Sequence, residues 1–504
     1  MDQYAVVLLS FPPDLPDSPT PHDHVAYDEA AKNHLNQLSH ILKENSVDLI
    51  TFGPQLLDLL NPAVNSLSYL AVLHTLVLPG LATSASREYL LEKLVIFLLS
   101  FDSIQTRYAG THLQDIFTAA GNGQLLPATV EVLATAILKL DPTGSMLTSS
   151  HVLLARLAYN TDNIEGAMPV IDKSIVFYPG MANRGDPKYL CDPNLPPPAY
   201  ISRESGLTTV LKPQNVMEYD MLCGMIYCSR REWAKACEAF ERIATFPARE
   251  HGVTKIMVDA YKRWVLVNLL WKGSCSENPS PLSSNAAHRY YEALGKPYTT
   301  LASLFPSEDA PALKNEFEAN TAVWQEDNTV GLVQEVLAAY QKWQVLALQQ
   351  VYSKISLAEV RRETRSAETG EHLPRDEDVE TLLQNMLLSG MLSGAVEKND
   401  DGTRFLTFLP PVTAASLSEH AFAKEIAATA LRLRELRPLL RVTDDRLGTH
   451  KEYIRHVIKE SKRDKSSSSV DPSPGGFGLG SGIGGGFQIE VDDEDLMGGI
   501  ISTS

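Results

Sequence analysis

The sequence predicts a mostly α-helical protein, in which a tetratricopeptide-like helical repeat solenoid is followed by a winged helix, a C-terminal bundle helix and a disordered tail. Three observations lead to this fold class: a helix-pair signature near the middle of the chain, a helix–helix–hairpin pattern after it, and a glycine-rich end. With 504 residues the chain is too long for one compact core, so two or three structural units are expected.

The helix-pair signature lies in residues 219–247. Gly224 precedes the aromatic Tyr227 by three residues, Ala236 follows nine residues later, Phe240 comes four after that, and a proline closes the unit. This order of small and aromatic residues is typical of a tetratricopeptide-like helix pair of about 34 residues. Gly224 and Ala236 would let two helices approach closely, with Tyr227 and Phe240 between them. Such a pair must stack on neighbours, which is typical of a scaffold.

Helical repeats are also expected earlier in the chain, over residues 27–215. Apolar residues recur there at three- and four-residue spacing, as on one face of an α-helix. A degenerate repeat occupies residues 150–179, and its Ala167 lies 69 residues before Ala236, close to two repeat lengths of about 34. A proline-rich insertion near 180–213 interrupts the pattern.

The winged helix is predicted from a change of pattern after a second stretch of repeats at 216–340. A Ser-x-x-Glu capping box at 356–359 starts a short helix. An acidic run at 376–380 suits the first turn of another helix. Residues 393–409 then alternate as two short strands around a turn. Helix, short helix, helix and β-hairpin in this order predict a winged helix over 341–410.

The two ends of the chain differ from its body. Residues 1–26 are rich in proline near their middle and are expected to form a loose N-terminal arm. Residues 411–465 are expected to be helical, with Pro438 kinking or ending a helix. Their apolar seam consists of Phe422, Ile426, Leu433, Leu436 and Leu440, interrupted at Thr429. Residues 466–504 contain ten glycines and few large apolar residues, so this tail should be disordered.

A basic concentration accompanies the seam. It includes Arg432, Arg434, Arg437 and Arg441 and continues with Lys451, Arg455, Lys459, Lys462, Arg463 and Lys465. One interpretation is a solvated helix face beside the seam, and the other is a contact with acidic partner helices.

Composition excludes several classes of function. The formal net charge is −18, and −12 remains without the acidic tail, which disfavours a protein that binds the phosphate backbone of nucleic acid. The five cysteines form no C-x-x-C pair, which fits a reduced intracellular compartment. No apolar stretch approaches the roughly 20 residues that span a bilayer, so no membrane contact is expected.

No catalytic, cofactor or metal site is expected. His22 and His24 have the spacing of an H-x-H zinc pair, but further ligands are missing, so a solvated loop is predicted. The glycine run at 475–486 lacks a flanking strand and helix and is interpreted as a linker. The segment 488–491, followed by acids, resembles a SUMO-interacting motif. The candidate recognition helix, within 376–390, has four acids and no Lys or Arg, which disfavours insertion into a DNA groove.

Three segments resemble a known family. The segments are CGMIYCSRREWAKACEAFERIATFPA (223–248), VDAYKRWVLVNLLWKGS (258–274) and QEDNTVGLVQEVLAAY (325–340). They are similar to the third-subunit family of the COP9 signalosome, within the PCI-domain proteins, and the resemblance is clear over about 219–410. The resemblance implies a PCI domain over 216–410.

The resemblance also implies a role. The signalosome removes a ubiquitin-like modifier from cullin-RING ubiquitin ligases, and the isopeptidase chemistry belongs to a zinc-containing subunit. A PCI subunit would hold the assembly together, with winged helices side by side and C-terminal helices in a common bundle. The first and eighth subunits would be its neighbours, in the cytoplasm and nucleus.

The hairpin supplies the expected pairing edge. Its residues are Arg404, Phe405, Leu406, Thr407, Phe408 and Leu409. Two alternatives remain: a PCI scaffold subunit of the proteasome lid or of translation initiation factor three, and a winged-helix adaptor that binds nucleic acid.

Overall fold

The computed structural model describes residues 2–13, 21–44, 46–77, 87–121, 129–178, 189–247, 253–275, 279, 285–307, 309–399, 403–409, 419–449, 451, 453–455 and 457–458. Helices dominate these residues, and the strands within them form one small sheet, which confirms the mostly α prediction. The chain divides into two compact units, Met1–Ala428 and Thr429–Ser504. The predicted tail at 466–504, with its SUMO-type segment, lies outside the described residues.

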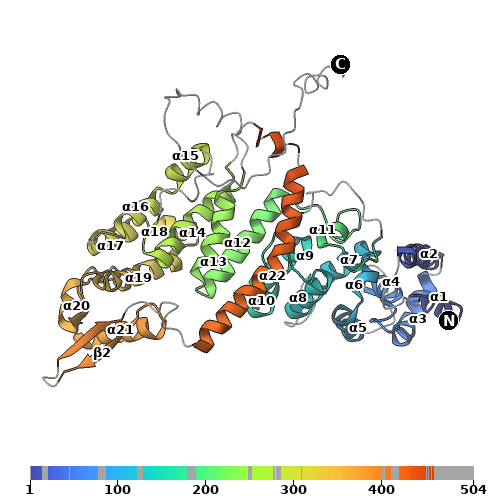
Figure 1. The fold of residues 1–504 in the computed structure, drawn as a ribbon, viewed down its shortest axis with the longest axis horizontal. Helices are drawn as coiled ribbons and strands as arrows, with labels where there is room; N and C mark the ends of the chain where they lie inside the picture. Colours follow the sequence, from blue (N-terminus) through green and yellow to red (C-terminus); the bar gives the residue numbers. More distant parts are fainter. Residues whose placement is uncertain are drawn as a thin grey trace, which may run out of the picture. The chain divides into compact units, whose positions relative to one another are not determined.

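The N-terminal part of the first unit is a succession of helices (Figure 1). Their bounds are α1 (Asp2–Leu8), α2 (Pro21–Glu44), α3 (Ser46–Leu59), α4 (Ser66–Val77), α5 (Arg87–Ser100), α6 (Ser103–Thr106), α7 (Gly110–Gly121), α8 (Thr129–Leu140), α9 (Ser149–Thr161) and α10 (Ile164–Ile171). Helix α4 packs on α3, α5 and α7, and α8 packs on α5, α9 and α10. Each helix thus buries its apolar face on helices near it in the sequence, as a repeat stack requires.

The stack continues through the middle of the chain. The bounds are α11 (Pro197–Tyr200), α12 (Pro213–Ser229), α13 (Trp233–Ala244), α14 (Lys255–Lys272), α15 (Asn285–Leu294), α16 (Lys296–Leu304), α17 (Ala310–Ala319), α18 (Thr321–Glu326) and α19 (Val330–Leu348). Helix α12 contacts α9 in the preceding repeat, α13 contacts both α12 and α14, and α19 packs on α14, α17 and α18.

Three helix-pair turns share one geometry. Asp162, Arg231 and Asn328 have φ angles of 55°, 59° and 52°, and they are the non-glycine residues with positive φ among those described. In each turn the next residue donates its N–H to a carbonyl five residues back. These bonds are Asn163 to Ala158 (3.1 Å), Glu232 to Tyr227 (2.9 Å) and Thr329 to Trp324 (2.9 Å). The arrangement is a helix C-terminal motif that satisfies carbonyls left open by the helix end. The α18–α19 turn therefore belongs to the same repeat system, although its sequence lacks the signature.

The predicted repeat-core residues lie where α12 crosses α13. A Cβ atom built on Gly224 would lie 2.5 Å from Cε1 of Phe240, so only glycine allows this approach. Ala236 and Phe240 are completely buried. The Tyr227 side chain reaches beyond this pair, because its hydroxyl donates a hydrogen bond to the carbonyl oxygen of Ile171 at 3.0 Å. Tyr227 thus joins α12 to the preceding repeat.

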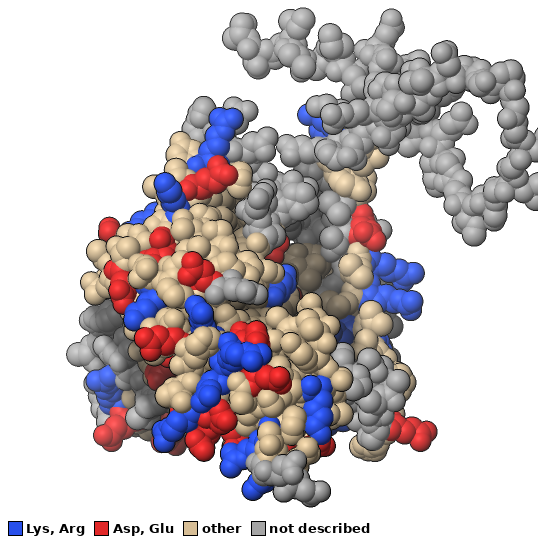
Figure 2. Space-filling view, turned by 90° about the vertical axis from the view of Figure 1, so that its left-hand side faces the viewer, with Lys and Arg blue, Asp and Glu red and all other residues tan. Residues whose placement is uncertain are grey.

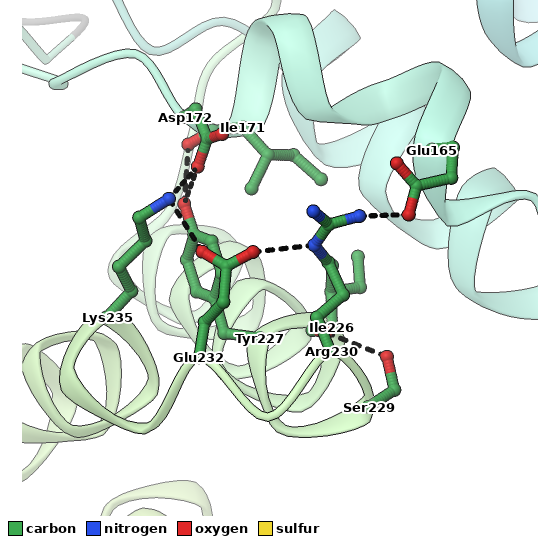
Figure 3. A network of polar contacts seen from close by, with 9 residues as sticks. All are labelled: Glu165, Ile171, Asp172, Ile226, Tyr227, Ser229, Arg230, Glu232 and Lys235. Atoms are coloured by element: carbon green, nitrogen blue, oxygen red, sulfur yellow. Dashed lines mark hydrogen bonds and ion pairs between the residues drawn. The ribbon is translucent and has the colours of Figure 1, made fainter. Parts of the chain in front are cut away.

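Figure 3 shows a polar network at this junction. Arg230, at the end of α12, pairs with Glu165 on α10 and donates from Nε to Oε1 of Glu232 at 2.7 Å. The Lys235 ammonium lies 2.7 Å from Oε2 of Glu232 and 2.8 Å from Oδ1 of Asp172. Hydrogen bonds from Lys235 and Arg230 hold the pKa of Glu232 below its usual range. Ion pairs this exposed contribute about 0–1 kcal/mol each, so the network fixes the relative position of the repeats more than it stabilises them.

The expected N-terminal arm is ordered at both of its ends. Residues Asp2–Leu8 form α1, and α2 already begins at Pro21. Leu8 and Phe11 are buried, and their carbonyl oxygens accept hydrogen bonds from Ser68 (2.7 Å) and Asn65 (2.8 Å) on the α4 side. The loose-arm prediction is wrong for these residues, because the short apolar stretch before the prolines packs on α4 and the residues just before it.

The proline-rich insertion is also packed where it is described. Tyr200 and Ile201 are buried. The guanidinium of Arg107 lies 3.8 Å from the centre of the Tyr200 ring and donates to the carbonyl oxygens of Leu190 (2.9 Å) and Asp192 (2.8 Å). Arg107, which lies between α6 and α7 in the sequence, therefore holds the insertion against this part of the stack.

The winged helix follows directly from the stack. Its elements are β1 (Lys354–Ser356), α20 (Leu357–Glu363), α21 (Asp376–Leu388), β2 (Gly394–Lys398) and β3 (Arg404–Phe408), and α22 (Glu419–Thr449) comes next. The capping box is present, with the Glu359 N–H donating to Oγ of Ser356 at 3.2 Å. Leu406 packs in its core with Val379, Leu383 and Met386 of α21. The core also includes Val345 of α19, so one continuous helix crosses the boundary expected near residue 340.

The close approach of α12 and α13 makes Gly224 intolerant even of alanine. Although alanine is favoured over glycine by about 1 kcal/mol in a helix, the new methyl group would overlap the Phe240 ring, so we expect Gly224→Ala to lower the free energy of unfolding by about 1–2 kcal/mol. Urea denaturation measures it. Gly331→Ala is the matched control, because a Cβ there meets nothing within 4 Å and should be neutral or stabilising. The double variant Gly224→Ala/Phe240→Leu tests whether the two sites are coupled. If it loses less free energy of unfolding than the sum of the losses in the two single variants, the new methyl group and the ring interact directly.

The junction network predicts a dependence of stability on pH. Because the folded-state pKa of Glu232 is lowered from 4.5, its contribution is present above that value and is lost as the pH falls through the folded-state pKa. Glu232→Gln should therefore cost less than about 1 kcal/mol near neutrality and nothing in strong acid. Denaturation midpoints measured across this pH range test the prediction. The control is Glu238→Gln, an exposed position on α13, the helix that Glu232 precedes. A constant difference at every pH would contradict the assignment.

Candidate protein-interaction surfaces

The three-stranded sheet has an order that the sequence did not reveal. The strands are antiparallel in the order β1–β3–β2, so β3 is central. Thr407 is paired with Lys354 of β1 on one side and with Ala395 of β2 on the other. The prediction that the strand Arg404 to Leu409 offers a free edge is therefore wrong. The reason is β1, a strand of three residues that ends at Ser356, the first residue of the capping box, and is too short to be recognised from its pattern.

The side chains of β3 have other tasks. Leu406 and Phe408 point into the winged-helix core. The Lys354 ammonium lies 5.1 Å from the centre of the Phe405 ring, and Arg404 is paired with Glu380 of α21. Leu409, just past the strand, remains half exposed. These residues stabilise the sheet and its packing on α21.

The outer strands of the described sheet are β1 and β2, and β2, with five residues against three, offers the longer edge. The Leu409 N–H donates to the Ser393 carbonyl, and the Asn399 N–H donates to the Thr403 carbonyl, each at 2.9 Å. Residues of β2 alternate in direction, so the backbone groups of Val396 and its i ± 2 neighbours point away from β3. An open row of donors and acceptors is a template for pairing with a strand of another chain.

One face of the sheet is polar. Glu397 on β2 reaches across β3, where its carboxylate lies 3.2 Å from the Lys354 ammonium and accepts a hydrogen bond from the Thr407 hydroxyl at 3.2 Å. The bond from Lys354 holds the pKa of this exposed carboxylate below its usual range. This face of the sheet thus presents charged and polar groups to solvent.

The acidic helix α21 has paired charges. Asp376 lies 3.3 Å from Arg361, Asp378 lies 3.6 Å from Arg375, and Glu380 pairs with Arg404. These arginines come from other elements or from the residue before α21, so the helix carries no basic row for a DNA groove. Figure 2 shows Lys and Arg interspersed with Asp and Glu over the face that it draws, rather than gathered in one basic field.

Helix α22 carries the predicted seam, and its apolar side chains are exposed on this chain. The exposed fractions are 42% for Phe422, 54% for Ile426, 63% for Leu433 and 62% for Leu440, and Leu436 is half-buried. The helix continues through Pro438 to Thr449, so this proline does not end it. Further along, Tyr453, Ile454, Val457 and Ile458 are also exposed. An apolar stripe of this length is suited to packing against other helices.

The described residues do not show the elements of a catalytic centre. No group of three or more His, Cys, Asp or Glu side chains that could hold a metal ion occurs among them. His24 lies in α2 and not in a solvated loop as predicted, with its Nδ1 3.4 Å from Sγ of Cys191. Burial raises the pKa of Cys223 and Cys228 to about 12, which leaves both as thiols and poor nucleophiles. Within the part of the chain described, no helix is long and apolar enough to cross a bilayer.

Comparison with known proteins relates the chain to one family. The family model described as "COP9 signalosome complex subunit 3, N-terminal helical repeats" matches residues 27–191 and 199–286. The unmatched residues between these ranges fall in the proline-rich insertion. The match also begins well before residue 219, where the resemblance seen in the sequence began.

Curated relatives carry the same description. A COP9 signalosome complex subunit 3 from Neurospora crassa is 37% identical over 99% of this chain and 99% of its own length. Those from Emericella nidulans and Arabidopsis thaliana are 27% and 23% identical over 88% and 69% of this chain, and over 89% and 73% of their own lengths. The family model and the full-length relative together show that the chain belongs to the COP9 signalosome subunit 3 family.

Proposed function

We propose that this chain is a noncatalytic scaffold subunit of the signalosome that supports removal of a ubiquitin-like modifier from cullin-RING ligases by a catalytic subunit. The observation that carries the proposal is a pair of association surfaces in the C-terminal third, the open β2 edge and the exposed seam of α22. Both surfaces suit contacts to protein backbone and apolar helices, and neither holds a nucleophile or a ligand set.

The repeat stack complements these surfaces. Its turns and junctions are held by polar networks and close helix packing, as at Gly224 and Arg230, so it would act as a stiff spacer between partners. The first and eighth signalosome subunits are the proposed neighbours, and the cytoplasm and nucleus are the proposed locations. Family membership favours the signalosome over the proteasome lid and initiation factor three, and the paired acids of α21 argue against a nucleic-acid adaptor.

A reconstitution tests the absence of catalysis. The isolated chain should not cleave a modified cullin with or without added zinc, because the described residues provide no ligand set. Adding it to a preparation of the other subunits should restore cleavage by restoring assembly, with both followed on the same samples by size-exclusion chromatography and gel analysis. Zinc-dependent cleavage by the isolated chain would overturn the scaffold assignment.

The β2 edge can be tested with one backbone group. Val396→Pro removes an N–H that points away from β3, so the sheet should survive while pairing with a neighbouring subunit weakens. Val396 also packs on the winged-helix core, and Val396→Ala is therefore the control that loses this packing but keeps the N–H. Co-purification with the other subunits is the measurement, and circular dichroism checks the fold. Normal assembly by folded Val396→Pro would argue against pairing at this edge.

A further inference from the structure

The seam of α22 follows a heptad register, and that register assigns a position to every neighbouring charge. With Phe422 at d and Ile426 at a, the a positions continue with Leu433, Leu440, Leu447 and Ile454, and the d positions with Thr429, Leu436, Thr443, His450 and Val457. The described apolar members at the a positions are all exposed. The stripe is therefore presented to a partner, and the residues that flank it at e and g will lie beside that partner's own flanks.

Three of the described flanking residues are basic. Arg432 occupies a g position, and Arg437 and Lys451 occupy e positions. The register also places the basic Arg446 at g and two acids, Glu425 at g and Asp444 at e. Arg432 and Arg437 are exposed, and neither forms an ion pair with another residue whose side chain the structure describes. Charges at e and g choose the partner of a coiled coil, because they face oppositely charged residues of the next helix.

The arginines also repel one another. Arg434, Arg437 and Arg441 are spaced at three and four residues on α22, where like charges are neighbours and destabilise a helix. An acidic partner would relieve this repulsion at Arg437, which flanks the seam. Arg434 and Arg441 occupy b positions, away from the seam, and provide an internal reference of the same charge.

We infer that the seam of α22 recognises an amphipathic helix of another signalosome subunit that carries Asp or Glu at its flanking positions. This inference rests on the proposed function, in which α22 enters a helix bundle, and adds the charge of the occupant. Apolar contact holds the helices together, and Arg432 and Arg437 select the acidic partner and its register.

The experiment compares matched double variants of the full chain, co-expressed with the other signalosome subunits. Arg432→Glu/Arg437→Glu reverses the flanking charges, Arg434→Glu/Arg441→Glu makes the same charge change away from the seam, and Leu433→Glu/Leu440→Glu disrupts the seam itself. Dissociation on dilution is measured by size-exclusion chromatography at about 0.1 M and about 1 M salt, where the Debye length falls from about 10 Å to about 3 Å. Circular dichroism verifies helix content.

We expect the flanking reversal to weaken assembly about tenfold at low salt, with most of the difference lost at high salt, and the b-position reversal to change it less than about twofold. Arg432→Gln/Arg437→Gln should fall between the wild type and the reversal, which separates loss of attraction from misfolding. Equal effects of the two reversals would overturn the inference while leaving the bundle intact. If Leu433→Glu/Leu440→Glu also assembles normally, the proposed use of α22 fails as well.

One competing occupant lies in the same chain. The tail after Lys465 contains Glu490 and the acidic run 492–495, which could meet the flanking arginines. Truncation after Lys465 should leave the difference between the two arginine reversals unchanged. If truncation abolishes that difference, the tail is the acidic partner and the inference is wrong.

Discussion

The contact between Gly224 and the ring of Phe240 sets how closely α12 approaches α13, and the stacking of the neighbouring repeats depends on that distance. Because Gly224 has no side chain, the Phe240 ring packs directly on the backbone of α12, and Tyr227 on α12 is held where its hydroxyl reaches the carbonyl of Ile171 in the preceding repeat. Helix α13 in turn packs on α14. A local close approach is thus converted into contact between successive helix pairs, which is the unit of stability in a repeat protein.

Charged residues next to two of the helix-pair turns form ion pairs with neighbouring helices. Arg230 precedes the left-handed Arg231 and joins the network between the repeats, while Asp327 precedes the left-handed Asn328 and binds Lys262 of α14 through both carboxylate oxygens, at 2.7 and 2.8 Å. The Lys262–Asp327 pair is largely buried, and the Asp327 carboxylate also accepts a hydrogen bond from the Tyr298 hydroxyl. A buried pair that lost one partner would leave an uncompensated charge, so these contacts specify one arrangement of the turn and the helix beneath it.

The C-terminal part contrasts with the stack because its association groups are open. With β3 in the centre, hydrogen bonds are made on both of its sides, and open backbone groups lie on the outer strands, of which β2 is the longer. Helix α22 leaves large apolar side chains in water. Isolated proteins commonly protect sheet edges and cover apolar stripes, since both favour association. This chain leaves both a sheet edge and an apolar stripe open in its described residues, and both features favour association with other proteins.

The sequence by itself determined the elements whose signal is local. The order Gly224, Tyr227, Ala236, Phe240 identified a helix pair, the capping box at Ser356 located α20, and the spacing along 422–440 identified the seam, because each depends on residues within a few turns. The tertiary structure alone decided the strand order, the packing of residues 2–13 and the contact of Arg107 with the insertion. These features depend on contacts between segments far apart in the chain. A three-residue segment such as β1 is too short to show a strand pattern and is recognised as a strand only by its hydrogen bonds to β3.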